Sequence, residues 1–187
     1  MAKEKDEILA AKAAGGDSRS FEDLVNRHRE SVYRLARSIT GTHDDADDAA
    51  QETFIRLYRS LSSYDPKRPF VPWLRRVAYN TSLNVLRASK RRWKETSDEL
   101  LPTVADTSHG PEDVLQTREA GKLLQEAVEG LSSELKATFM LRASEGMSYR
   151  DIASVTGVRM GTVMSRLSRA REKILQSIEP IVMGGDW

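Results

Sequence analysis

Apolar residues recur at three- and four-residue steps over most of this sequence, and this spacing limits the fold more than any other feature. Over residues 21–39 it places one continuous apolar face on a helix. No stretch has the alternation that a half-buried strand requires. The spacing is lost over residues 95–113, where two prolines, a glycine and several acidic residues predict an extended linker. We therefore predict an all-α chain of two small helical domains, 1–94 and 114–187, joined by a flexible acidic linker.

Capping residues predict where the helices begin and end. In the first domain we expect one helix to begin at Ser20 and to end at Gly41, and the next to begin at Asp44 or Asp45. Three prolines then predict a break before helical structure resumes. The other expected boundaries are a start at Trp73, an end near Arg92, and starts near Val114, at Ser132 or Ser133, and at Ser148.

Composition excludes several classes of protein. There is no cysteine, so disulfides, thiol nucleophiles and cysteine-bound zinc are ruled out. The three histidines are scattered without metal-ligand spacing, and we expect no metal, no cofactor and no catalytic residue. No apolar run approaches the ~20 residues of a membrane-spanning helix, and the segment 8–14 is too short for a signal peptide. We expect a cytoplasmic protein with no direct membrane insertion.

A net charge of +1 conceals strongly segregated charges. Nine basic residues and no acidic one lie between Lys67 and Lys94, whereas five acidic residues crowd the short segment 44–52 just upstream. A solvated face could account for either run. The basic run without acids is better explained by an anionic partner, and the acidic segment by a protein contact.

Aromatic residues are interleaved with the cations of the basic run, namely Phe70, Trp73, Tyr79 and Trp93. Basic side chains bind phosphates, and aromatic rings stack on unpaired bases with ~1–3 kcal/mol per base. Trp73 and Tyr79 also lie at helical spacing, so a core position remains an alternative for both. The run predicts binding to a nucleic-acid backbone with exposed bases.

Residues 148–173 contain two short helical patterns around Gly157, which suits a turn with a left-handed residue. Ala153 supplies the small residue where two helices cross. The second pattern is expected to present Thr162, Ser165, Arg166 and Arg169 on its free face, as a recognition helix for the DNA major groove does. The alternative is a helical hairpin with a solvated arginine face.

Three segments, in this order, resemble those of bacterial sigma factors of the extracytoplasmic-function type, which are RpoE-like members of the sigma-70 family. DDADDAAQETFIRLYRSL at 44–61 is similar to the helix that binds the β′ clamp of RNA polymerase. PFVPWLRRVAYNTSLNVLRASKRR at 69–92 is similar to the segment that recognises and melts the −10 element. GMSYRDIASVTGVRMGTVMSRLSRAREKI at 146–174 is similar to the helix-turn-helix that reads the −35 element.

The resemblance implies that 1–94 is sigma domain 2, that 114–187 is sigma domain 4, and that specific residues carry their contacts. The residues implied for polymerase binding are Asp48, Gln51, Glu52, Phe54, Ile55 and Leu57, of which Phe54 and Leu57 are better explained as core. Those implied for the −10 element are Tyr64, Lys67, Arg68, Phe70, Trp73, Arg76, Asn80, Asn84 and Arg87. Those implied for the −35 element are Arg159, Thr162, Ser165, Arg166, Arg169 and Arg171.

The implied function is that of a sigma factor rather than an enzyme. Its partners would be core RNA polymerase, through the β′ clamp and the β flap, promoter DNA, and an anti-sigma factor that controls a stress or envelope-response regulon. The sequence departs from the family pattern at Met160, where a proline is common, at Met164, where an arginine is common, and at Ser168, where some relatives have a bulkier side chain. These departures leave the −35 base sequence open.

Two other functions fit parts of the sequence. An autonomous helix-turn-helix regulator would explain 148–173, but it would leave the aromatic-basic run and the acidic segment unexplained. A nucleic-acid enzyme would need an acidic metal cluster near the basic surface. The acids at 44–48 crowd one expected helix start, where the helix dipole favours them.

Overall fold

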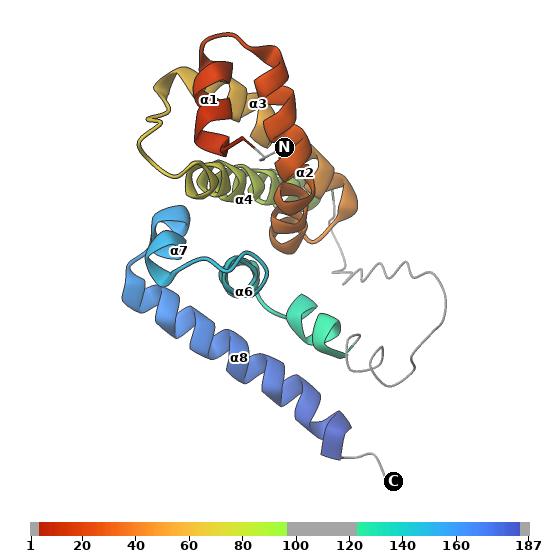
Figure 1. Cartoon of the computed structure of the whole chain (residues 1–187). Helices are drawn as coiled ribbons and strands as arrows, with labels where there is room; N and C mark the ends of the chain where they lie inside the picture. Colours follow the sequence, from red (N-terminus) through yellow and green to blue (C-terminus); the bar gives the residue numbers. More distant parts are fainter. Residues whose placement is uncertain (1–3, 97–122, 184–187) are drawn as a thin grey trace, which may run out of the picture.

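The computed structural model describes residues 4–96 and 123–183, and the regular structure in these two ranges is entirely helical (Figure 1). The predicted all-α fold with two helical groups is therefore confirmed. The first group contains α1 (Asp6–Ala14), α2 (Ser18–Thr40), α3 (His43–Ser60), the short 3-10 helix η1 (Leu61–Ser63) and α4 (Phe70–Thr96). The second contains a helical stretch at 123–129, α6 (Ser133–Ala143), α7 (Tyr149–Thr156) and α8 (Met160–Met183).

Helix α2 begins earlier than the sequence indicated. Its N-cap is Asp17, whose carboxylate accepts the backbone N–H of Arg19 at 3.1 Å. Ser20 lies inside the first turn and donates its hydroxyl to Asp17 at 2.6 Å, so the expected start at Ser20 is wrong. The expected end is confirmed, because Gly41 has the left-handed backbone (φ 86°) that ends many helices.

Helix α3 is capped by Thr42, and the expected cap at Asp44 or Asp45 is wrong. The Thr42 hydroxyl accepts the backbone N–H of Asp45 at 3.2 Å. Both aspartates lie in the first turn of the helix. Their charges therefore still complement the positive end of the helix dipole.

Helix α4 also begins earlier than expected, at Phe70 rather than Trp73, and it includes Pro72. A proline is tolerated here because backbone N–H groups in the first turn have no partner within the helix. At its other end the helix continues to Thr96, past the expected boundary with the linker. The rest of that linker and the expected start near Val114 lie outside the described residues.

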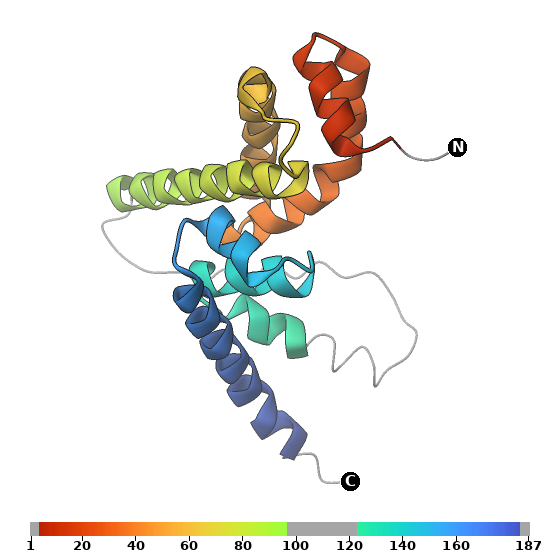
Figure 2. The same ribbon diagram turned by 60° about the vertical axis from the view of Figure 1, so that its left-hand side comes forward.

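The two helical groups pack directly against each other. Helix α2 contacts α6, and α4 contacts α7, as Figures 1 and 2 show from two directions. One continuous core includes residues from both groups, for example Leu74 of α4 and Ile152 of α7, each fully buried. A smaller cluster joins the 123–129 stretch to α8 through Ala127 and Ile174. The packing of α4 against α7 thus brings the helix predicted to contact the −10 element and the predicted helix-turn-helix together at one interface.

Candidate nucleic-acid interface

Helices α7 and α8 form the predicted helix-turn-helix. Ser148 caps α7: its hydroxyl oxygen accepts the backbone N–H of Asp151 at 3.2 Å and donates to the Asp151 carboxylate at 2.6 Å. Gly157 ends α7 with φ 71°. Val163 and Leu167 of α8 are buried against the rest of the domain. The expected cap and the expected turn residue are both confirmed.

The outer face of α8 presents most of the side chains predicted for the −35 element. Met160 and Met164 lie exposed among them, at 51% and 50%. They occupy two of the three positions at which the sequence departs from the family pattern, and the surface is less basic at Met164, where an arginine is common. The exposed predicted residues are Arg159, Thr162, Ser165, Arg169 and Arg171.

Arg166 is the exception on α8. Its side chain is 16% exposed, and its Nη2 donates to Glu134 of α6 at 2.9 Å. The expectation that it lies on the free face is therefore wrong for this arrangement. The reason is tertiary, because α8 turns this position toward α6 and α4, where an acidic partner is available.

Helix α4 carries the second predicted DNA surface. Arg76, Asn80, Asn84 and Arg87 are exposed, and their spacing of three or four residues places them along one side of the helix. Two amides and two guanidinium groups supply hydrogen-bond donors for phosphates and for base edges. Lys67 and Arg68 lie exposed in the loop before the helix, and those two positions add positive charge to the same domain.

An aromatic cluster joins that loop to the start of α4. The rings of Tyr64 and Trp73 stack with centroids 4.8 Å apart, and Phe70 meets both rings edge-on at 5.7 and 5.8 Å. Phe70 is fully buried and supports the cluster, whereas Tyr64 and Trp73 remain partly exposed. Burial, reinforced by Glu7, raises the pKa of Tyr64 to about 12, so this hydroxyl stays protonated at neutral pH.

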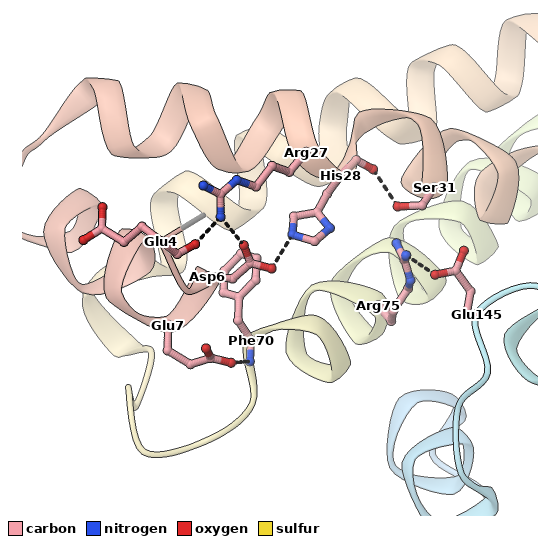
Figure 3. A network of polar contacts seen from close by, with 9 residues as sticks. All are labelled: Glu4, Asp6, Glu7, Arg27, His28, Ser31, Phe70, Arg75 and Glu145. Atoms are coloured by element: carbon pink, nitrogen blue, oxygen red, sulfur yellow. Dashed lines mark hydrogen bonds and ion pairs between the residues drawn. The ribbon is translucent and has the colours of Figure 1, made fainter. Parts of the chain in front are cut away.

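Arg75 belongs to the basic run, but the sequence analysis gave it no role of its own. Its side chain is buried inside the molecule. Only 2% of its side chain is exposed, and it forms an ion pair with Glu145 in the loop between α6 and α7 (Figure 3). Burial lowers the pKa of Arg75, and Glu145 opposes that shift. The prediction that the whole basic run faces an anionic partner is wrong at this residue. Its spacing from the buried Tyr79 and Ser82 was the available signal.

The two predicted DNA surfaces border one cavity of about 390 Å³. From α4 it is lined by Asn80, Asn84 and Arg87, which were predicted to contact the −10 element. From the second helical group it is lined by residues that include Thr156 and Arg166. Duplex DNA could not enter a space of this size, so the sides of these residues that line the cavity are closed to a duplex in this arrangement.

Helix α3 presents an acidic and partly apolar face away from the core. Asp48, Gln51 and Ile55 are exposed, Ile55 at 39%, while Glu52 and Phe54 are half-buried. Leu57 is fully buried, so it cannot contact a partner here, in agreement with the core explanation given above.

Tyr58, which the sequence analysis did not select, extends the exposed face of α3. Its side chain is 55% exposed, and its ring meets Phe21 edge-on at 4.9 Å. It lies one helical turn beyond Ile55, and this three-residue spacing was the signal that could have identified it.

Within 4–96 and 123–183, no cluster of three or more histidine, cysteine or acidic side chains is suited to hold a metal ion. In the same residues no helix has the length and apolarity needed to cross a membrane.

Comparisons with known proteins identify both helical groups. Residues 15–92 match the family model of sigma-70 region 2, and residues 121–174 match that of sigma-70 region 4. The ECF RNA polymerase sigma-E factor of Haemophilus influenzae is 33% identical over 186 residues, which cover 95% of this chain and 97% of that protein. The ECF RNA polymerase sigma factor SigE of Mycolicibacterium smegmatis is 37% identical over 155 residues, which cover 83% of this chain but only 60% of that protein.

Solved structures with the same fold come from complexes. CnrH in complex with the cytosolic domain of CnrY is 29% identical, with a TM-score of 0.66, over 93% of this chain and 97% of that one. RpoE from Bartonella quintana, in complex with the anti-sigma factor NepR, is 22% identical, with a TM-score of 0.71, over 86% of this chain and 98% of that one. The second likeness concerns the fold alone.

Proposed function

Because this chain belongs to the extracytoplasmic-function sigma factors of the sigma-70 family, which are non-enzymatic transcription initiation factors, we propose how its own residues divide that work. Residues 1–94 act as sigma domain 2, which binds core polymerase and recognises and melts the −10 element. Residues 114–187 act as sigma domain 4, which reads the −35 element. Residues 95–113 link them.

One observation carries this division of work: each helical group has its own exposed surface suited to a different form of DNA. The α4 surface combines amides and guanidinium groups with the partly exposed Tyr64 and Trp73. That combination suits separated strands, because aromatic rings stack on unpaired bases. The α8 surface has arginines and hydroxyls on one helix and no exposed aromatic ring among the predicted residues, which suits a major groove.

The exposed α3 face is the surface we assign to the β′ clamp. Ile55 and Tyr58 offer apolar area within a rim of acidic and amide side chains that includes Asp48 and Gln51. Interfaces between proteins commonly have such an apolar centre with a polar rim. Domain 4 would contact the β flap. Both contacts take place in the cytoplasm, where core polymerase and promoters are found.

An anti-sigma factor is the further partner we propose. CnrH, which covers nearly the whole of this chain at 29% identity, was solved with the cytosolic domain of CnrY. A protein that covers either DNA surface would hold the factor inactive until a stress or envelope signal releases it.

Footprinting of the holoenzyme on a promoter fragment tests the division of work. With Asn84→Ala, we expect the permanganate reactivity of unpaired thymines in the −10 element to fall, while protection of the −35 element remains. With Arg169→Ala, we expect −35 protection to weaken first. Gln176→Ala, an exposed change further along α8, is the control. Loss of both signals in either variant alone would contradict the assignment of separate elements to separate helices.

A further inference from the structure

The start of α4 is capped from a distant part of the chain. The residue before the helix is Pro69, whose side chain has no oxygen that could accept a hydrogen bond. The backbone N–H of Phe70 instead donates to Oε1 of Glu7 at 3.1 Å, across 63 residues of sequence (Figure 3). A carboxylate at a helix N-terminus is favoured both by this hydrogen bond and by the helix dipole.

Glu7 is itself held in place by its neighbours. The adjacent Asp6 accepts hydrogen bonds from Arg27 at 3.0 Å and from His28 at 2.8 Å, both on α2 (Figure 3). Leu9 and Ala10 of α1 are buried in the core that includes Phe70. The carboxylate of Glu7 is therefore presented by an anchored helix, and it fixes where α4 begins.

The start of α4 also supports the loop and rings that we assign to the −10 element. Phe70, whose N–H binds Glu7, is fully buried beneath the stacked pair of Tyr64 and Trp73. The Tyr64 hydroxyl donates to the backbone carbonyl of Arg68 at 2.5 Å, which ties the loop to the same cluster. A shift of the first turn of α4 would consequently move both rings and the loop.

We infer that Glu7 is a positioning residue for −10 recognition, which acts by fixing the first turn of α4 and the aromatic cluster seated on it. The inference rests on the proposed function of that surface. Glu7 lies outside the segment that matches sigma-70 region 2, which begins at residue 15. Part of the promoter specificity of this chain would thus depend on its N-terminal helix.

The test compares binding of holoenzyme to two fluorescent single-stranded oligonucleotides, one with the −10 sequence of a promoter mapped with this protein and one with that sequence substituted. The measured quantity is the ratio of the two affinities. Unfolded protein lowers both affinities alike, so the ratio reports positioning and not the amount of folded protein. The variants are Glu7→Ala, Glu7→Gln, which keeps an acceptor oxygen, and the matched control Glu4→Ala, whose side chain pairs with the exposed Lys12.

We expect E7A to lower the ratio about fivefold, the scale of a lost helix cap. E7Q should retain at least half of the wild-type ratio, and E4A should equal wild type. An E7A ratio within experimental error of wild type would overturn the inference. If the wild-type holoenzyme itself shows no preference between the two oligonucleotides, the proposed −10 function fails instead.

A second variant covers the case in which E7A does not fold. Asp6→Asn weakens the anchor of α1 to Arg27 and His28 while leaving Glu7 in place. We expect it to lower the ratio about twofold, less than a lost cap would. An unchanged ratio in D6N, when E7A yields no folded protein, would overturn the inference.

Discussion

At the scale of single residues, short polar side chains and glycines decide where the helices of this protein begin and end. Gly41 and Gly157 could be identified from the sequence because a left-handed backbone position strongly favours glycine. Ser20 was a wrong choice because the apolar stripe from Phe21 marks the buried face of α2 and not its first residue. Asp17, one turn earlier, offers an equally good cap and lengthens the helix.

Gly157→Ala tests the turn of the helix-turn-helix. A Cβ at this position would have no atom within 4 Å, so the cost is purely that of a positive φ. We expect about 1 kcal/mol of lost stability, measured by chemical unfolding. Gly161→Ala is the matched control, since its Cβ would also meet nothing and its φ is not positive. An equal loss in both variants would contradict this account of the turn.

Asp17 makes the stability of the protein depend on pH. The hydrogen bond from the Ser20 hydroxyl, more than any other favourable contact, lowers the pKa of Asp17. A lowered pKa in the folded state means that the stabilisation is complete above the ordinary value of about 4 and is lost as the pH falls through the folded value.

Asp17→Ala should therefore lower the unfolding temperature at neutral pH, and the gap from wild type should narrow below about pH 4. Calorimetric scans of both proteins over this range provide the measurement. Asp23→Ala, an exposed change within α2, serves as the control. A gap between wild type and Asp17→Ala that stays constant down to acid pH would contradict the capping role.

At the scale of elements, the apolar spacing predicted most of the helices, but it did not predict all of their boundaries. Pro72 was taken to exclude a helix, but α4 includes it within its first turn, where a proline costs no hydrogen bond. The boundaries of α1 could not be predicted, because its buried face is largely alanine and its cap on α4 depends on residues 63 positions apart.

The proposed −35 surface of α8 predicts that its exposed arginines contribute to duplex binding. Arg169→Ala removes an exposed guanidinium from the proposed −35 surface, and we expect holoenzyme to bind a duplex −35 fragment about tenfold more weakly. Fluorescence anisotropy at fixed salt measures the change. Glu172→Ala, on the same helix and also exposed, should not weaken binding. Equal weakening by both variants would indicate a general disturbance of α8 and would contradict a specific contact.

At the scale of the whole molecule, the two domains are joined by a packed interface as well as by the linker. The sequence predicted the two domains but not their contact. Charged residues such as Arg75 and Glu145 are expected at the surface. The tertiary structure brings these two together and buries the arginine. In this arrangement Asn80, Asn84 and Arg87 of α4 line the same cavity as Arg166 of α8. We therefore expect promoter binding to require the domains to separate.

Glu145→Ala should favour that separation. It leaves Arg75 buried without its partner, which lowers the stability of the closed arrangement by about 3 kcal/mol for a well-buried pair. When the domains separate, the arginine can be solvated by water. The additional change Arg75→Met removes the buried charge and should close the molecule again.

Energy transfer between two introduced cysteines, at Asp23 and Leu175, measures the separation, because the native chain has no cysteine. Unchanged transfer in Glu145→Ala would show that this ion pair does not hold the domains together.

Run-off transcription tests the central claim, that this chain gives RNA polymerase its choice of promoter. Purified core polymerase would be incubated with fragmented host DNA, with and without the protein, and the transcript starts would be mapped. The account predicts discrete transcripts only when the protein is present, with shared −35 and −10 sequences upstream of their starts. It would be contradicted if no such transcripts formed while the protein alone protected a duplex site, as an autonomous regulator does.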